Sequence, residues 1–189
     1  VPPHWATYFE VADLDEGLAK VKKAGGTLLD GPIDEPGVGR MAVVQDAVGA
    51  YLRLWVPARW QGGETFNVPG AMIWNELCTD EPARANAFYK AVLDLDAAVI
   101  DAGGRPYTLL KIGDDPVAGI LPQTPEMEAD GSTWDVYFAA DDVDEVVARG
   151  KKAGGSVLAE PFDLPVGARM AVVKDPFGAV FEIMSAEAP

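Results

Sequence analysis

The side chains used most often for nucleophilic catalysis and metal binding are scarce in this chain of 189 residues. Cys78 is its only cysteine and His4 its only histidine. One thiol builds neither a disulfide framework nor a thiolate zinc site, and one imidazole excludes any site that needs two from a single chain. We expect Cys78 to fill buried space in a cytoplasmic, reducing environment, and His4 to have no role.

Carboxylates are the chemical groups that the chain has in excess. Thirty acidic residues against fifteen basic ones give a formal net charge of −15. Two neighbouring carboxylates can raise the pKa of one of them and so form a general acid–base pair. A surface this negative repels phosphate backbones and anionic lipids, and no stretch approaches the roughly 18 apolar residues of a membrane helix. Nucleic acid and membrane are therefore excluded as main partners.

An internal repeat determines how these groups are positioned. Residues 5–55 align without a gap with residues 134–184, at a shift of 129, with 24 identities in 51 positions. Each copy is predicted to fold as βαβββ. Aromatic and β-branched runs at 5–11 and 134–140 predict strands, and Asp13 and Asp142, each three residues before a glutamate, predict helix N-caps. The first copy continues with strands predicted at 27–29, 41–44 and 50–56, and with a Pro/Gly-rich turn after 27–29.

The middle of the chain has the same order of elements in a different sequence. A strand is predicted at 71–78, a helix beginning near Pro82, and three strands near 97–100, 107–112 and 117–121. The predicted organisation is a module at 1–56, a linker at 57–70, and a domain at 71–189 that contains modules 71–122 and 132–185.

The second and third modules resemble the vicinal oxygen chelate superfamily, which contains glyoxalase I, bleomycin-resistance proteins and extradiol dioxygenases. The motifs that carry the resemblance are Asn75-Glu76-Leu77, Asp80-Glu81-Pro82 and Ala87-Phe88-Tyr89, then Asp141-Asp142-Val143-Asp144, Lys152-Ala153-Gly154-Gly155, Asp175-Pro176-Phe177-Gly178 and Phe181-Glu182-Ile183. The resemblance implies an α+β fold, in which βαβββ modules pair into a curved, cup-shaped mixed β-sheet with the helices outside.

The number of modules is odd, whereas modules of this superfamily work in pairs and its tandem-domain members carry four. Residues 1–56 resemble a second-type module that lacks its first. A lone four-stranded unit leaves sheet edges unpaired. We therefore expect either a missing N-terminal module or a homodimer to supply the partner.

Metal-dependent members of the superfamily bind one divalent ion through the first and last strands of each module. The resemblance puts the corresponding positions at Trp74, about Gly119, Asp135 and Glu182, and in the first copy at Ala6 and Arg53. Of the first four only Asp135 and Glu182 could ligate, which is too few for a catalytic metal. We expect no metal cofactor, or at most a divalent ion held weakly by these two carboxylates.

Strand alternation predicts which further side chains line the cup. In the complete pair of modules these are Trp74, Glu76, Asp135, Tyr137, Glu182 and Met184. In the first module the matching residues are Tyr8, Glu10, Tyr51, Arg53 and Trp55. The alternate residues Trp134, Phe138, Phe181 and Ile183 should face the helices. Aromatic walls with a few carboxylates are typical of a small-molecule pocket.

Three functions fit these observations. The first is a metal-free protein, similar to glyoxalases and bleomycin-resistance proteins, that binds a small organic ligand. The second is a lyase, isomerase or dioxygenase that uses a divalent ion or a carboxylate pair, with Glu182 and Asp135 as candidate catalytic residues. The third is an interaction protein whose cups are vestigial. The missing metal ligands favour the first over the second.

Overall fold

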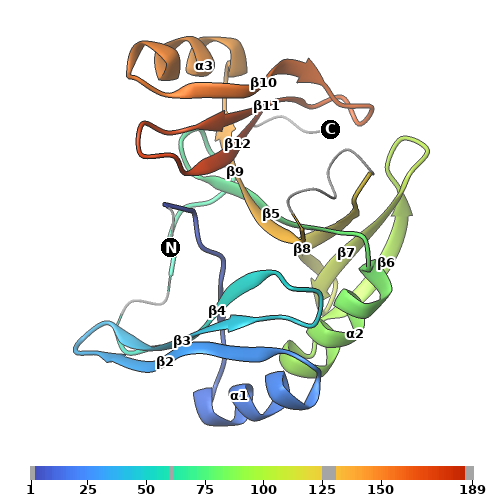
Figure 1. Cartoon of the computed structure of the whole chain (residues 1–189). Coiled ribbons are helices and arrows are strands. Elements are labelled where there is room, and N and C mark those ends of the chain that lie inside the picture. The colour runs from blue at the N-terminus through green and yellow to red at the C-terminus, as the bar shows by residue number, and fades with distance from the viewer. Residues whose placement is uncertain (1–2, 60–61, 125–130, 186–189) are drawn as a thin grey trace.

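The computed structural model describes residues 3–59, 62–124 and 131–185, which form three βαβββ modules in two β-sheets (Figure 1). Residues 60–61 of the predicted linker, residues 125–130 between the second and third predicted modules, and the two ends of the chain at 1–2 and 186–189 lie outside the described residues. Within the described residues, no helix is long and apolar enough to cross a bilayer.

The first module forms a four-stranded sheet in the order β1-β4-β3-β2. Asp13 caps its helix as predicted, because its carboxylate accepts a hydrogen bond from the amide of Glu16 at 2.9 Å. The second strand is longer than predicted, because two register shifts keep it paired with its neighbour as far as Glu35, and the turn is confined to 36–38. The elements are β1 (Tyr8–Glu10), α1 (Leu14–Lys23), β2 (Thr27–Glu35), β3 (Gly39–Gln45) and β4 (Tyr51–Pro57).

The other two modules share one eight-stranded sheet in the order β10-β11-β12-β9-β5-β8-β7-β6. The second module contains β5 (Met72–Thr79), α2 (Pro82–Leu93), β6 (Asp96–Asp101), β7 (Pro106–Ile112) and β8 (Asp115–Pro122). The third contains β9 (Thr133–Ala140), α3 (Val143–Lys152), β10 (Ser156–Asp163), β11 (Arg169–Lys174) and β12 (Val180–Ser185). The α+β fold, with paired modules in a curved mixed sheet and helices outside, is thus confirmed.

The sequence repeat is also a repeat of strand pairing. Tyr8 lies opposite Arg53 in the first module, and Tyr137 lies opposite Glu182 in the third, which are the same two positions at the shift of 129. The strand order β9-β12-β11-β10 repeats the order β1-β4-β3-β2. The two copies differ at one edge, since β9 also pairs with β5 whereas β1 is the end strand of its sheet.

One hydrophobic core joins the first module to the second. α1 packs beside α2 at the bottom of the molecule in Figure 1, and their buried side chains belong to one cluster that includes Leu14, Val21, Leu54, Leu77, Phe88 and Tyr89. A smaller cluster lies under α3 and includes Val143, Val147, Val173 and Ile183.

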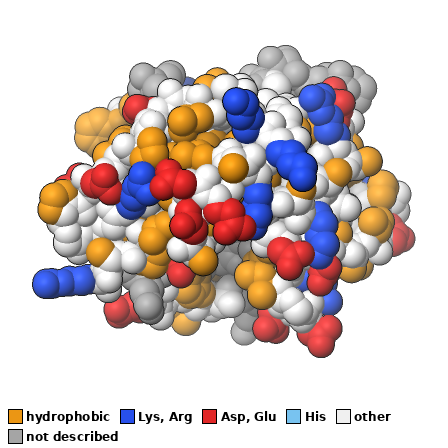
Figure 2. Space-filling view, turned by 90° about the horizontal axis from the view of Figure 1, so that it is seen from below, with side chains coloured by type: hydrophobic (Ala, Val, Ile, Leu, Met, Phe, Trp, Pro, Cys, Tyr) orange, Lys and Arg blue, Asp and Glu red, His pale blue; other side chains and the backbone are white. Residues whose placement is uncertain are grey.

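On the face seen from below, acidic and basic side chains are interspersed with hydrophobic ones (Figure 2).

Candidate functional site

The middle strands of the eight-stranded sheet bring the predicted carboxylates together on the face opposite the helices, which we call the cup face. Glu76 on β5 lies opposite both Asp135 on β9 and Gly119 on β8. Glu182 on β12 lies opposite Tyr137 on β9. The residues that alternate with them pack toward the helices, as predicted, and include Leu77, Trp134 and Ile183.

Glu76 is buried and held by a tyrosine. The Tyr137 hydroxyl donates a hydrogen bond to Glu76 Oε1 at 2.8 Å, and both side chains are buried. Burial raises the pKa of Glu76, while the hydroxyls of Tyr107 and Tyr137 oppose that rise by stabilising the charged form. Burial, followed by the charge of Glu76, also raises the pKa of Tyr137. Tyr137 and Glu76 therefore form a buried hydrogen bond between a donor hydroxyl and an acceptor carboxyl group.

Glu182 is the chemically unusual member of the group. Its side chain is 6% exposed, and its Oε2 atom is buried with no hydrogen-bond partner among the described residues. Burial raises its pKa to about 9, and the neighbouring charges of Asp135 and Glu76 add to the rise. At neutral pH the Glu182 carboxyl therefore carries a proton and can donate a hydrogen bond as well as accept one.

Tyr107, which was not predicted from the sequence, occupies the place that the resemblance assigns to a metal ligand near Gly119. A Cβ atom added to Gly119 would lie 1.8 Å from the Tyr107 hydroxyl oxygen. The indole of Trp74 donates a hydrogen bond to the same hydroxyl at 2.7 Å. A glycine inside a strand often marks such a close approach, and this signal could have indicated a large neighbour on the next strand.

Cys78 is buried, as predicted, on the cup-face side of β5. Its Sγ atom lies 3.9 Å from Glu76 Oε1. Burial raises the pKa of the thiol, and the charges of Asp135 and Glu76 raise it further. Since the thiolate is the reactive form of cysteine, these surroundings make Cys78 inert as a nucleophile. Met184 extends the cup face beyond Glu182 on β12 and lies opposite Met170 on β11.

The donor set on the cup face does not fit a catalytic metal ion. In the part of the chain that the structure describes, no three histidine, cysteine, aspartate or glutamate side chains come together so as to hold one. The Tyr107 hydroxyl fills the position at Gly119. The raised pKa of Glu182 weakens that carboxyl as a ligand at neutral pH, because a metal ion would have to displace its proton. We therefore assign no chemical step here to a metal.

The matching residues of the first module lie together on the other sheet, apart from this group. The Arg53 guanidinium lies 5.2 Å from the centre of the Tyr8 ring, and its Nη2 atom is 3.4 Å from His4 Nε2. Trp55 is buried and meets the Tyr8 ring edge-on, whereas Tyr51 is 60% exposed. His4, expected to have no role, thus contacts the arginine that stands at the position of Glu182.

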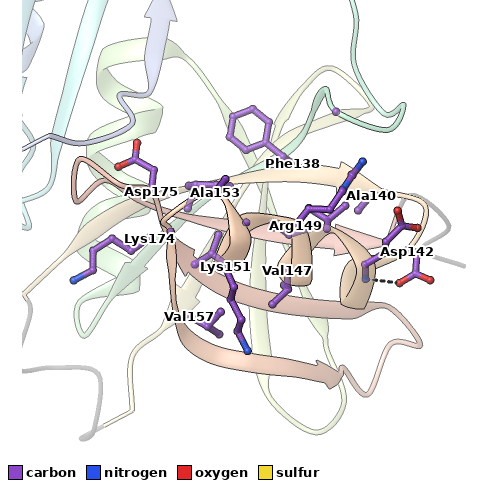
Figure 3. Close-up of a pocket in the computed structure, with 18 of the residues that line it drawn as sticks. Phe138, Ala140, Asp142, Val147, Arg149, Lys151, Ala153, Val157, Lys174 and Asp175 are labelled. Atoms are coloured by element: carbon purple, nitrogen blue, oxygen red, sulfur yellow. Dashed lines mark hydrogen bonds between the residues drawn. The ribbon is translucent and has the colours of Figure 1, made fainter.

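A pocket of about 550 Å³ lies on the other side of the eight-stranded sheet, between α3 and the strands under it (Figure 3). Glu76, Tyr137 and Glu182 do not line it. The residues around it include Phe138, Val147, Gly155, Val173, Asp175 and Phe181. The pocket and the carboxylate group are therefore separate features of the molecule.

With this fold and site, the chain belongs to the Glyoxalase/Bleomycin resistance protein/Dioxygenase superfamily, whose pattern matches residues 71–183. It is 42% identical over 185 residues to the protein named "Putative glyoxylase CFP32" of Mycobacterium tuberculosis, covering 97% of this chain and 70% of that one. It is 40% identical over 187 residues to "Anthracycline biosynthesis protein DnrV" of Streptomyces peucetius, covering 97% of this chain and 66% of that one.

Two solved structures share the fold at low sequence identity. The Mn(II)-bound glyoxalase from Novosphingobium aromaticivorans has a TM-score of 0.60 and 17% identity, with 95% of this chain and 62% of that one covered. The 2,2',3-trihydroxybiphenyl 1,2-dioxygenase from Sphingomonas wittichii strain RW1 has a TM-score of 0.63 and 15% identity, with 97% and 71% covered. Likeness at this level establishes the fold alone.

Proposed function

We propose that the protein binds a small organic molecule on the cup face without a metal ion, and that Glu182 recognises a polar atom of that molecule. The observation that carries the proposal is the buried Oε2 atom of Glu182, which has no hydrogen-bond partner among the described residues. A buried polar atom without a partner costs about 1–3 kcal/mol. A ligand oxygen or hydroxyl beside Glu182 would recover that free energy.

The surroundings of Glu182 indicate the class of ligand. A protonated Glu182 donates a hydrogen bond to a carbonyl oxygen or accepts one from a hydroxyl. The neighbouring carboxylates and the net charge of −15 disfavour an anion. Trp74 and Tyr107 offer aromatic surface close by. A neutral aromatic compound with carbonyl or hydroxyl groups fits best, and the 40% identity to an anthracycline biosynthesis protein supports a role in small-molecule metabolism.

The test combines elemental analysis with ligand titration. We expect purified protein to contain no stoichiometric metal, and a panel of neutral aromatic ketones and phenols to contain compounds that quench its tryptophan fluorescence. Glu182→Leu should weaken their binding by tenfold or more, while Glu182→Gln, which still donates and accepts, should retain most of it. Glu35→Gln, at an exposed position at the end of β2, is the control. Stoichiometric metal that disappears in Glu182→Gln would overturn the proposal.

One observation favours a second candidate function, proton transfer by carboxylates. Glu182, with its pKa near 9, stands beside Glu76 and Asp135, and a carboxylic acid that keeps its proton at neutral pH can act as a general acid. Binding and catalysis are distinguished by turnover. A binding protein returns a bound ketone unchanged, whereas an enzyme converts it or exchanges its α-protons with solvent deuterium in a way that Glu182→Gln abolishes.

A further inference from the structure

The first module carries the opposite charge from the third module at equivalent positions of its sheet. At the repeat shift of 129, Glu182 corresponds to Arg53 and Asp135 corresponds to Ala6. The strand pairing is the same in both copies, since Arg53 and Glu182 each lie opposite a tyrosine on the first strand of their module. One backbone arrangement therefore carries two carboxyl groups in the third module and a guanidinium group in the first.

Arg53 is a cation that no carboxylate pairs with in the part of the chain that the structure describes. Its guanidinium lies 5.2 Å from the centre of the Tyr8 ring, and its Nη2 atom is 3.4 Å from His4 Nε2. Glu10 follows Tyr8 on the same face of β1, but it lies opposite the next inward residue of β4 and forms no ion pair with Arg53. The charge of Arg53 is thus balanced by an aromatic ring and not by an acid.

This arrangement differs from that of other arginines in a chain with thirty acidic and fifteen basic residues. Arg40, Arg84 and Arg169 each form an ion pair with a carboxylate at 2.9 Å or less. A guanidinium has five N–H donors in its plane, and contact with the face of a ring uses none of them. Arg53 therefore keeps donors for the oxygens of an anion.

Aromatic side chains surround Arg53 on the same face of the four-stranded sheet. Tyr51 and Trp55 alternate with the residues between them along β4, so they share a face with Arg53. Tyr8 is 47% exposed and Tyr51 is 60% exposed, while the buried Trp55 meets the Tyr8 ring edge-on. Exposed rings beside a guanidinium offer a surface for a flat aromatic molecule that carries a negative group.

The charge of the whole molecule selects among such anions. A guanidinium binds a carboxylate or a phosphate through two parallel N–H···O hydrogen bonds. The net charge of −15 opposes the approach of any anion, and it opposes a dianion such as phosphate more strongly than a monoanion. The tyrosine rings add to the affinity only when the ligand itself has aromatic surface. An aromatic monocarboxylate therefore fits this surface better than inorganic phosphate does.

We propose that this face of the first module is a second ligand site, which binds an aromatic carboxylate through Arg53. The carboxylate would accept two hydrogen bonds from the guanidinium, and the aromatic ring would lie against Tyr8 and Tyr51. The His4 imidazole would lie at the edge of the site, beside Nη2 of Arg53. The site does not depend on the function proposed for Glu182, because it lies on the other sheet and selects a ligand of different charge.

The test is a titration of the 189-residue chain with 2-naphthoate, followed by the NMR signals of the amides in β1 and β4. We expect 2-naphthoate to bind at least tenfold more tightly than 2-naphthamide, which lacks the charge, or inorganic phosphate, which lacks the ring. Arg53→Gln should weaken the binding of 2-naphthoate by tenfold or more and leave that of 2-naphthamide nearly unchanged. Arg84→Gln, which removes the same charge from an exposed position on α2, is the matched control.

Three further variants separate the charge from the shape and the place of the site. Arg53→Lys keeps the charge but loses the parallel donors, so it should bind 2-naphthoate more weakly than the parent chain and more tightly than Arg53→Gln. Tyr51→Ser removes an exposed ring and should bring the affinity for 2-naphthoate closer to that for phosphate. Glu182→Leu should leave the binding of 2-naphthoate unchanged, which distinguishes this site from the one on the eight-stranded sheet.

Three results would overturn the proposal. The first is a titration in which 2-naphthoate leaves the signals of β1 and β4 unshifted up to its solubility limit, or binds no more tightly than 2-naphthamide. The second is an equal loss of affinity in Arg84→Gln and Arg53→Gln, because net charge alone would then account for the binding. The third is a set of shifts confined to the surroundings of Glu182 and lost in Glu182→Leu, which would place the ligand in the third module.

Discussion

At the scale of single residues, the cup face contains several buried polar side chains, whereas the polar side chains of an ordinary sheet are exposed to solvent. Glu76, Tyr137 and Glu182 are all buried, yet only the first two satisfy each other by a hydrogen bond. Buried carboxyl groups lower stability unless they are paired or protonated. The protonation of Glu182 should therefore affect the stability of the protein and its dependence on pH.

The pH dependence of stability should change when Glu182 is replaced. Its pKa is about 9 in the folded protein against an ordinary value of 4.5. Between these values the unfolded chain releases the proton and the folded chain keeps it. The free energy of unfolding therefore falls as pH rises, by about 1.4 kcal/mol per unit for one proton. Stability from this group is fully present below pH 4.5 and is lost as pH rises toward 9.

Glu182→Gln removes that proton, so its stability relative to the parent chain should increase from pH 5 to pH 8. Urea unfolding at three pH values measures the difference, and Glu10→Gln, at an exposed position, serves as the control. A constant difference between Glu182→Gln and the parent across this range would contradict the assignment of the raised pKa to Glu182.

Gly119→Ala should destabilise the protein by about 1–3 kcal/mol through overpacking. The added methyl would overlap the Tyr107 hydroxyl, which must then leave its hydrogen bond with Trp74. Thermal unfolding measures the loss. Tyr107→Ala in the same chain removes the clash, so the double variant should lose less than the sum of the two single ones. Gly150→Ala is the control, because the added methyl group meets open space on a helix, and it should leave stability unchanged or raise it. A Gly119→Ala variant as stable as Gly150→Ala would refute the close contact between Gly119 and Tyr107.

The face of each cup residue could be predicted from the sequence, but the partners of those residues could not. Alternation along a strand has a fixed period, so Glu76 and Glu182 were placed on the same side as Tyr137. The contact of Tyr107 with Gly119 depends on the register between two strands, which strand propensity does not encode. The raised pKa of Glu182 likewise depends on burial by residues far apart in the sequence.

At the scale of elements, the two copies of the repeat form the same structures in different surroundings. α1 and α3 each have ten residues and an aspartate N-cap. The helix starts were predicted because capping is local. The length of β2 was not, because the register shifts that extend it into the predicted turn depend on pairing with β3. The packing of α2 on α1 could not be predicted either, because it depends on contacts between residues far apart in the sequence and not on a local pattern.

The glycines after the two helices offer a matched test of those surroundings. A Cβ atom at Gly26 would lie 2.7 Å from the carbonyl oxygen of Gln45 and 2.8 Å from the Phe88 ring, whereas one at Gly155 would lie 3.0 Å from the carbonyl oxygen of Lys174. Gly26→Ala should therefore destabilise more than Gly155→Ala, by about 1–3 kcal/mol.

Urea unfolding of the two variants measures the difference between these positions. Phe88→Leu should relieve part of the cost of Gly26→Ala and none of the cost of Gly155→Ala. Equal losses at the two glycines would show that α2 does not press on the first copy.

At the scale of the whole molecule, the second module holds the chain together. Its strand β5 pairs with β9 of the third module, and its helix α2 packs on α1 of the first. The division into 1–56 and 71–189 stays a prediction. The two sheets are separate, but the core cluster runs from Leu14 and Leu54 in one part to Leu77 and Phe88 in the other. A shared core favours cooperative unfolding of both parts.

Tyr89 is the residue that best tests this coupling, because its hydroxyl contacts the first and third modules at once. It donates to Asp46 Oδ2 and accepts a hydrogen bond from the Trp134 indole at 2.8 Å. Tyr89→Phe leaves both buried partners unsatisfied and should lower the free energy of unfolding by about 2 kcal/mol. Because the larger core joins the first and second modules, amide exchange at β3 and at β8 should report the same loss. Tyr51→Phe, on an exposed side chain, should change neither probe. A loss confined to β3, or two separate transitions in calorimetry, would show that the first module unfolds independently of the eight-stranded sheet.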